Sequence, residues 1–243
     1  MRRLFLILLF ALPLQADALA DVRSALQKLT ATSAIRATFE LQRNETDEGR
    51  FANDKSGGKA SVEVEADATS FRLIVPRPMI DQVGSELDAR AKDPDKSTPT
   101  ERALGQISTV MAFESLDAAP ALLRLMDDAK IVSDGAGTWA GKPVRVVILR
   151  LADKIGKTPG KVTISENKLT LWLGPDHVPL AAEHIRNGKF SFLILKSEMK
   201  TRRSWHFARS GDRLVRARYE ATETSSGMGQ KGTDVTVATV RVH

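Results

Sequence analysis

The chain has 243 residues, no cysteine and a formal net charge of +6. Without cysteine it can hold no disulfide framework, no zinc–thiolate site, no cysteine nucleophile and no lipid attachment site of a bacterial lipoprotein. Its 36 basic residues are spread among 30 acidic ones and form no DNA-reading motif, so nucleic acid is not expected as a partner.

The first 20 residues have the three parts of a secretory signal. Two arginines precede an apolar run from Leu4 to Leu14, and Ala18-Leu19-Ala20 provides the small residues of a cleavage site. The apolar run is much shorter than the roughly 20 residues that span a bilayer. We therefore expect residues 1–20 to be removed.

The mature chain, residues 21–243, is expected to form a single domain in the periplasm. Its length is ample for one hydrophobic core. Its basic charge favours anionic lipid over nucleic acid as an electrostatic partner, so transient contact with a membrane surface is expected.

A short helix should open the mature chain, with Asp21 at its start and Val22, Ala25, Leu26 and Leu29 on one face.

Three strands are predicted next. Alternating polarity indicates strands over 35–42, 62–66 and 71–75. The polar, glycine-containing stretch 44–59 is interpreted as a loop, and the charged stretch 81–98 as a mobile loop.

A helical insert should follow these strands. Thr98 is a suitable N-cap with Glu101 at the capping-box spacing, which predicts one helix over Thr98–Phe113. Its apolar face carries Leu104, Ile107 and Met111. A second helix is expected from about Asp117 to Asp128.

From Lys130 to the end the pattern is that of consecutive strands. Asn187-Gly188 is a strong two-residue hairpin signal, and short connections imply antiparallel pairing. The glycine-rich stretch 225–232 is interpreted as a flexible hairpin loop. The predicted strands cover 131–133, 144–151, 162–165, 169–173, 180–186, 190–199, 204–209, 214–222 and 234–242.

Three of these strands are informative about burial. Residues 144–149 and 190–195 are apolar on both faces, which predicts central strands covered on both sides or facing a ligand cavity. The strand 214–221 alternates instead, and its face with Arg216, Arg218 and Glu220 is expected to be solvated.

No pattern of catalytic residues stands out. The chain lacks a nucleophile-elbow motif and a metal-binding helix, and no spacing assigns a third ligand to its scattered histidines. We therefore expect a protein that is not an enzyme and has no metal and no cofactor. The four histidines are His177, His184, His206 and His243.

The order of elements resembles the outer-membrane lipoprotein carrier (LolA/LolB-like) family. The matching parts are the signal, the opening helix 21–30, the strand 34–41, and the stretch 169–183 with its Trp, Asp and Pro around a turn. The resemblance implies an unclosed antiparallel barrel of about 10–12 strands with helices across its concave apolar face. The family's functional arginine has a partial counterpart in Arg77, displaced relative to the strand.

The resulting hypothesis is a periplasmic carrier or chaperone that holds acyl chains of a lipid or lipoprotein in the half-barrel. The alternative is a non-enzymatic subunit or adaptor of an envelope protein complex that binds through the sheet edge. The expected lining residues are Phe39, Phe71, Leu73, Val146, Phe192, Trp205 and Phe207, with Leu104, Ile107 and Met111 as the lid.

Overall fold

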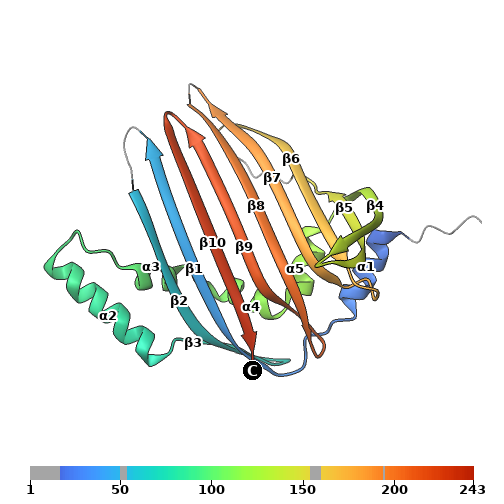
Figure 1. The fold of residues 1–243 in the computed structure, drawn as a ribbon, viewed down its shortest axis with the longest axis horizontal. Helices are drawn as coiled ribbons and strands as arrows, with labels where there is room; N and C mark the ends of the chain where they lie inside the picture. The colour runs from blue at the N-terminus through green and yellow to red at the C-terminus, as the bar shows by residue number, and fades with distance from the viewer. Residues whose placement is uncertain (1–16, 50–53, 154–159, 194) are drawn as a thin grey trace, which may run out of the picture.

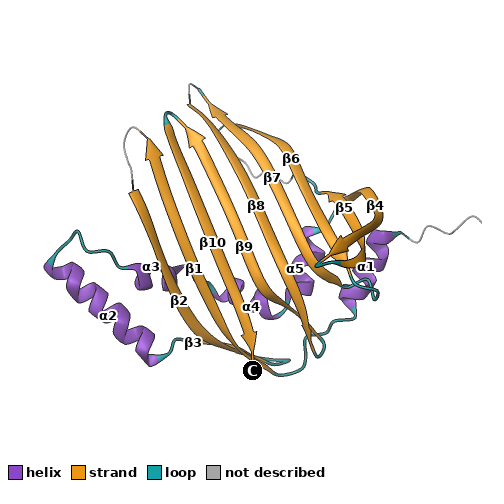
Figure 2. Cartoon of the chain, viewed as in Figure 1, coloured by secondary structure: helices purple, strands orange, loops and turns teal. Residues whose placement is uncertain are grey.

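The computed structural model describes residues 17–49, 54–153, 160–193 and 195–243. Within them the fold is mainly β, with ten strands and five helices (Figures 1 and 2). The strands are β1 (Ile35–Gly49), β2 (Asp54–Ala66), β3 (Phe71–Ile74), β4 (Lys130–Trp139), β5 (Lys142–Arg150), β6 (Lys161–Leu173), β7 (Pro179–Phe192), β8 (Leu195–Ser210), β9 (Arg213–Gly227) and β10 (Gln230–Val242). The helices are α1 (Ala18–Gln27), α2 (Arg77–Lys92), α3 (Pro99–Gln106), α4 (Thr109–Leu116) and α5 (Ala118–Leu125).

All ten strands belong to one open antiparallel sheet, in the order β3-β2-β1-β10-β9-β8-β7-β6-β5-β4. The chain builds β1–β3, inserts the helices, and then adds β4 to β10 as a meander whose last strand pairs with β1. This confirms the predicted unclosed antiparallel half-barrel and the position of the helical insert after three strands.

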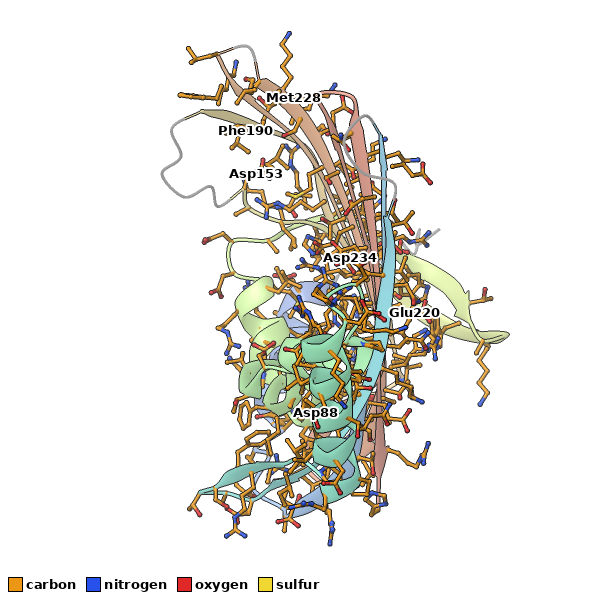
Figure 3. The ribbon with its side chains drawn as sticks, turned by 90° about the vertical axis from the view of Figure 1, so that its left-hand side faces the viewer. Asp88, Asp153, Phe190, Glu220, Met228 and Asp234 are labelled. Atoms are coloured by element: carbon orange, nitrogen blue, oxygen red, sulfur yellow. The ribbon has the colours of Figure 1, made fainter. Side chains whose placement is uncertain are left out.

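The strands are long, and the helices cover only part of their length. Strands β1, β8 and β9 have 15, 16 and 15 residues, whereas a typical strand has about 5–6. In β1 the inward residues are buried from Ile35 to Leu41, and this pattern stops beyond Leu41. The sheet therefore has a half covered by helices and an uncovered half, as the edge-on view shows (Figure 3).

Two hydrophobic clusters lie between the helices and the sheet. In the first, here called the α1–α5 core, helices α1 and α5 pack on strands β5 to β9. The second, here called the α3–α4 cluster, joins α3 and α4 to strands β1 to β3 and to parts of β9 and β10. The buried residues of the α1–α5 core include Val22, Leu26, Leu122, Met126, Val147, Leu149, Leu169, Leu171, Trp205 and Leu214. Those of the α3–α4 cluster include Ile35, Phe39, Leu41, Val62, Val64, Ala112, Leu116 and Val215.

Strand β5 is apolar on both faces, as expected, and both faces are covered. Val147 and Leu149 lie in the α1–α5 core. Val146 alternates with them and pairs with Trp172 on the opposite face. There the ring of Trp139 lies 5.2 Å from that of Trp172 and 5.1 Å from that of His206. The β4–β5 hairpin thus bends over the outer face of the sheet.

The helical insert differs from the prediction in two ways. The expected single helix Thr98–Phe113 is two helices, because Ser108 has an extended backbone and its hydroxyl accepts a hydrogen bond from the amide of Met111. The expected loop 81–98 is largely helix α2, which begins after Pro76 and carries an Arg77–Asp81 ion pair one turn apart.

The predicted loop 44–59 is also wrong in part, because β1 continues to Gly49 and β2 begins at Asp54. Polar residues form strand there since most of this part of the sheet lies beyond the helices (Figure 3), although α3 approaches β2 closely at Gly58.

The β7–β8 hairpin turns at a different place from the predicted one. Asn187-Gly188 lies inside β7, opposite a register shift in β6 between Ile164 and Glu166. The strand continues to Phe192, so the apolar run 190–195 forms a hairpin end and not a covered central strand. Residue 194 lies outside the described residues.

The first helix begins before the predicted mature start. Asp17 caps α1 by accepting a hydrogen bond from the Leu19 amide at 3.0 Å, and Ala18 and Leu19 are buried. The predicted cleavage after Ala20 falls inside this helix. Residues 1–16 lie outside the described part of the chain, and removal of the signal stays a prediction.

Candidate functional site

The α3–α4 cluster gathers the largest group of the predicted lining residues. Phe39 is fully buried at its base, and the others surround it from β3 and from the two helices. These residues come from three separate stretches of sequence and meet because β3 pairs with β2 and the helices cross back over β1 and β2. They are Phe39, Phe71, Leu73, Leu104, Ile107 and Met111.

The remaining predicted residues lie elsewhere. Trp205 and Phe207 pack in the α1–α5 core, Val146 lies on the outer face, and Phe192 is at the β7–β8 hairpin end. Arg77 is the first residue of α2, where its exposed side chain pairs with Asp81 at 2.9 Å.

The α3–α4 cluster is incompletely closed. Leu104, Ile107 and Met111 are only half-buried although they face the sheet. The side chain of Phe113 is 40% exposed, and its ring meets that of Phe71 edge-on at 5.5 Å. Apolar surface thus reaches solvent around both helices, and an apolar ligand could enter there by displacing them.

Few polar contacts hold α3 in place. Its first amides are bound by Glu86 of α2, whose carboxylate accepts from Thr100 at 2.9 Å and from Glu101 at 3.1 Å. Gly58 of β2 permits the close approach of the helix, because a Cβ there would lie 1.9 Å from the carbonyl oxygen of Pro99. The sequence alone did not identify Glu86 or Gly58 as part of this arrangement.

A buried arginine joins α4 to the sheet. Arg216 of β9 donates to Glu114 of α4 at 3.3 Å, and Glu114 also accepts from Arg124 at 2.7 Å. The guanidinium carbon of Arg216 lies 6.0 Å from the centroid of the Trp205 ring, and burial lowers the pKa of Arg216. Arg216 therefore connects the α3–α4 cluster with the α1–α5 core.

The burial of Arg216 corrects the prediction that it lies on a solvated face. Its side chain is only 13% exposed, whereas Arg218 and Glu220 are more open. The reason is a register shift between β8 and β9, where His206 pairs with Arg218 and Phe207 with Arg216, so that Ala217 of β9 is an extra residue. Such a shift breaks the two-residue alternation on which the prediction depended.

The uncovered half of the helix-facing surface is polar. Leu41, Tyr219 and Leu171 lie in one row of paired residues across the sheet. The next rows, farther from the helices, contain charged residues such as Asp234, which is labelled in Figure 3. Arg43 donates to Asp234 at 2.7 Å and Arg203 to Glu223 at 2.6 Å. This surface is suited to polar partners and not to acyl chains.

His184 lies at the boundary between the α1–α5 core and this polar surface. Its Nε2 is 2.8 Å from the amide oxygen of Asn167. Burial lowers the pKa of His184 to about 4, and the nearby guanidinium groups of Arg203 and Arg186 add to the effect. The imidazole is therefore neutral at neutral pH.

The described residues contain no cluster of metal ligands. No three His, Asp or Glu side chains among them are grouped so that they could hold a metal ion. No helix in the same part of the chain has both the length and the apolar character needed to cross a bilayer.

Comparison with known proteins adds little. No family model and no curated protein matches the chain. Among solved structures it is similar to MucB, in a crystal structure of MucB in complex with MucA(peri), with 13% sequence identity and a TM-score of 0.24. The match covers 91% of this chain and 93% of that chain. A similarity this low carries no conclusion about the function of this chain.

Proposed function

We propose that this protein is a periplasmic, non-enzymatic carrier that binds an acyl chain of a lipid or lipoprotein beneath helices α3 and α4. The observation that carries the proposal is the incomplete closure of the α3–α4 cluster, where six of the predicted lining residues meet and helix residues stay half-buried. Each acyl CH₂ moved from water into such an environment contributes about 0.8 kcal/mol, so a long chain supplies ample free energy for binding.

The geometry suggests how the site opens. Helices α3 and α4 have eight residues each and are interrupted at Ile107 and Ser108, so neither is stable without its packing on the sheet. When α4 moves outward, Glu114 leaves Arg216 but keeps Arg124, which belongs to the adjacent helix α5. The carboxylate thus retains a partner, which lowers the electrostatic cost of opening.

A fluorescent acyl probe tests the proposal on two variants of the same helical segment. Ile107→Glu places a carboxylate among the half-buried residues of the cluster and should abolish probe binding. Val110→Glu is the matched control, because Val110 is 65% exposed and its substitution should leave binding unchanged. Equal probe binding by Ile107→Glu and the unsubstituted protein would count against an acyl site beneath α3 and α4.

A third variant examines the connection between α4 and the sheet. Glu114→Gln weakens its ion pairs with both Arg216 and Arg124, so α4 should leave the sheet more readily. We expect faster uptake of the acyl probe in stopped-flow measurements, with an unfolding midpoint close to that of the unsubstituted protein. Slower uptake would contradict the role given to this ion pair.

The alternative function, an adaptor in an envelope protein complex, is favoured by the exposed edge of the sheet. Among the strands that the structure describes, β4 pairs only with β5, and most of its residues are exposed. An edge strand of this kind can pair with a strand of another protein. Val132 lies at a register shift and has no partner in β5, so Val132→Pro should disrupt added pairing while leaving the hairpin intact. Stoichiometric co-purification of an envelope protein, lost in this variant and without bound lipid, would favour the adaptor.

A further inference from the structure

Two adjacent hairpins end in exposed apolar side chains at the end of the sheet remote from the helices. At the β7–β8 turn Leu193 is 85% exposed, with Phe192 and Leu195 each 38% exposed. At the β9–β10 turn Met228 is 69% exposed. Figure 3 shows Phe190 and Met228 together at this end, while Asp88 of α2 lies toward the other end.

The two hairpin ends form one surface because β8 and β9 are neighbours in the sheet. A hollow of about 500 Å³ lies between them, lined by Phe190 and Leu195 from one hairpin and by Met228 from the other. Lys196 and Lys231 also line it. We call this the tip surface, and it comprises Phe190, Phe192, Leu193, Leu195, Lys196, Met228 and Lys231.

The backbone at both turns makes the apolar residues unusual. Leu193 has φ +52° and Met228 has φ +53°, the left-handed region in which a side chain is strained and glycine or asparagine is normally found. Their side chains are exposed, so packing within the protein does not offset this strain.

Basic side chains surround the apolar apex. Lys189 pairs with Glu198 at 2.7 Å. Within the described residues Lys196, Lys200 and Lys231 have no carboxylate partner within ion-pair distance, although Asp47 also lines the hollow. The apolar side chains at the apex are complementary to the acyl chains of a bilayer, and the ammonium groups behind them are complementary to its anionic headgroups.

We propose that the tip surface docks the protein on an anionic phospholipid bilayer, with Leu193 and Met228 inserted among the acyl chains and Lys196 and Lys231 against the phosphates. A second copy of the chain is a poorer occupant, because apposed tips would bring like-charged lysines together. This docking involves the opposite part of the sheet from the α3–α4 cluster, so it does not depend on the ligand proposed for that cluster.

Sedimentation with lipid vesicles tests the docking. The protein should bind vesicles of phosphatidylcholine containing phosphatidylglycerol, bind vesicles of phosphatidylcholine alone far less, and dissociate as salt is raised. Leu193→Asn and Met228→Asn should each weaken binding about ten-fold, because an apolar side chain no longer enters the bilayer. Asparagine tolerates the left-handed backbone, so the unfolding midpoint of both variants should stay the same or rise.

Two controls make the result specific. Val132→Asn removes an apolar side chain that is 63% exposed on β4 and should leave vesicle binding unchanged. The chain has no cysteine, so Met228→Cys and Val132→Cys each accept a single environment-sensitive fluorophore. Its emission should shift to shorter wavelength on anionic vesicles at position 228 and not at position 132.

Three outcomes would overturn the proposal. One is equal binding to vesicles with and without phosphatidylglycerol, or to neither. Another is unchanged vesicle binding by the double variant Leu193→Asn/Met228→Asn. The third is a concentration-dependent dimer in sedimentation velocity that these substitutions abolish, without binding to vesicles, which would assign the tip surface to a second copy. None of these outcomes bears on the acyl probe, so the two proposals fail separately.

Discussion

The α1–α5 core and the α3–α4 cluster both pack helices on the same face of one sheet, but they close it to different degrees. In the α1–α5 core the helices contribute fully buried side chains such as Leu26 and Met126. In the α3–α4 cluster Leu116 is fully buried, but Leu104 and Met111 remain half-buried, and the other buried helix positions are small, such as Ala103 and Ala112. The same architecture thus combines a closed core with a cluster that is only partly closed.

Polar contacts reinforce this difference. Arg145 of β5 donates to Asp21 of α1 at 3.0 Å and to Asp134 of β4 at 2.7 Å. Arg23 of α1 donates to the carbonyl oxygen of Met126 at 2.8 Å. These contacts link α1 to the sheet and to the end of α5, whereas α4 reaches the sheet through the Glu114–Arg216 pair. We expect the two regions to respond very differently to the same perturbation.

The largest effect should come from a carboxylate placed in the α1–α5 core. Met126 is fully buried, so Met126→Glu should lower the free energy of unfolding by about 3–5 kcal/mol. Urea denaturation measures this directly. Ile107→Glu, the same carboxylate in the α3–α4 cluster, should lower it by less than about 1 kcal/mol, since the half-buried position lets the charge reach water. Similar losses at both positions would remove the distinction between the two regions.

A smaller effect is expected when the start of α1 is removed. A chain that begins at Asp21 lacks the Asp17 cap and the buried side chain of Leu19, which together stabilise the fold by about 2–4 kcal/mol. Thermal and urea unfolding of chains beginning at Asp17 and at Asp21 measure the difference. Equal stability of the two chains would show that the first turn of α1 is not part of the α1–α5 core. N-terminal sequencing of exported protein then tells which start the cell uses.

The pH dependence of stability tests His184, which lies at the boundary between the α1–α5 core and the polar surface. As pH falls below about 6.5 the unfolded chain protonates His184, whereas the folded protein keeps it neutral down to about pH 4. The stability from the neutral imidazole is therefore complete above pH 6.5 and is lost between pH 6.5 and 4, by on the order of 2 kcal/mol. In the His184→Gln variant the urea unfolding midpoint should change less with pH between 6.5 and 4. An unchanged slope would show that His184 is not the group responsible.

The smallest expected difference between the two regions, in the rate of amide exchange, can be measured without a substitution. Amides of α3 and α4 should exchange with deuterium at least about ten-fold faster than those of α1 and α5, because elements that open for a ligand have low local stability. Hydrogen–deuterium exchange with mass spectrometry reads both pairs of helices in one sample. Bound acyl probe should slow exchange in α3 and α4 alone. Equal exchange in the two pairs would mean that the α3–α4 cluster is as closed as the α1–α5 core.

The candidate site shows what the spacing of apolar side chains in the sequence could predict and what it could not. The apolar spacing of Leu104, Ile107 and Met111 correctly identified the side of the helical insert that faces the sheet. It could not show that the insert breaks at Ser108. A serine hydroxyl caps a new helix only where the backbone is no longer helical, and the spacing of apolar residues does not show where that happens. Trp205 and Phe207 were expected to line the same site, but strand order places them in the α1–α5 core.

The sequence by itself determined the fold class, the antiparallel meander and the inward faces of β1 and β2 in the covered half, because alternation with a period of two requires only local geometry. Tertiary structure decided the rest. Opposite the extra residue of β6, Asn187-Gly188 became part of a strand, and next to the extra residue Ala217 of β9, where its pairing with β8 shifts, Arg216 became buried. In both places the deciding contact comes from a neighbouring strand. Register between strands depends on pairing across the sheet, so no local pattern in one strand could have revealed it.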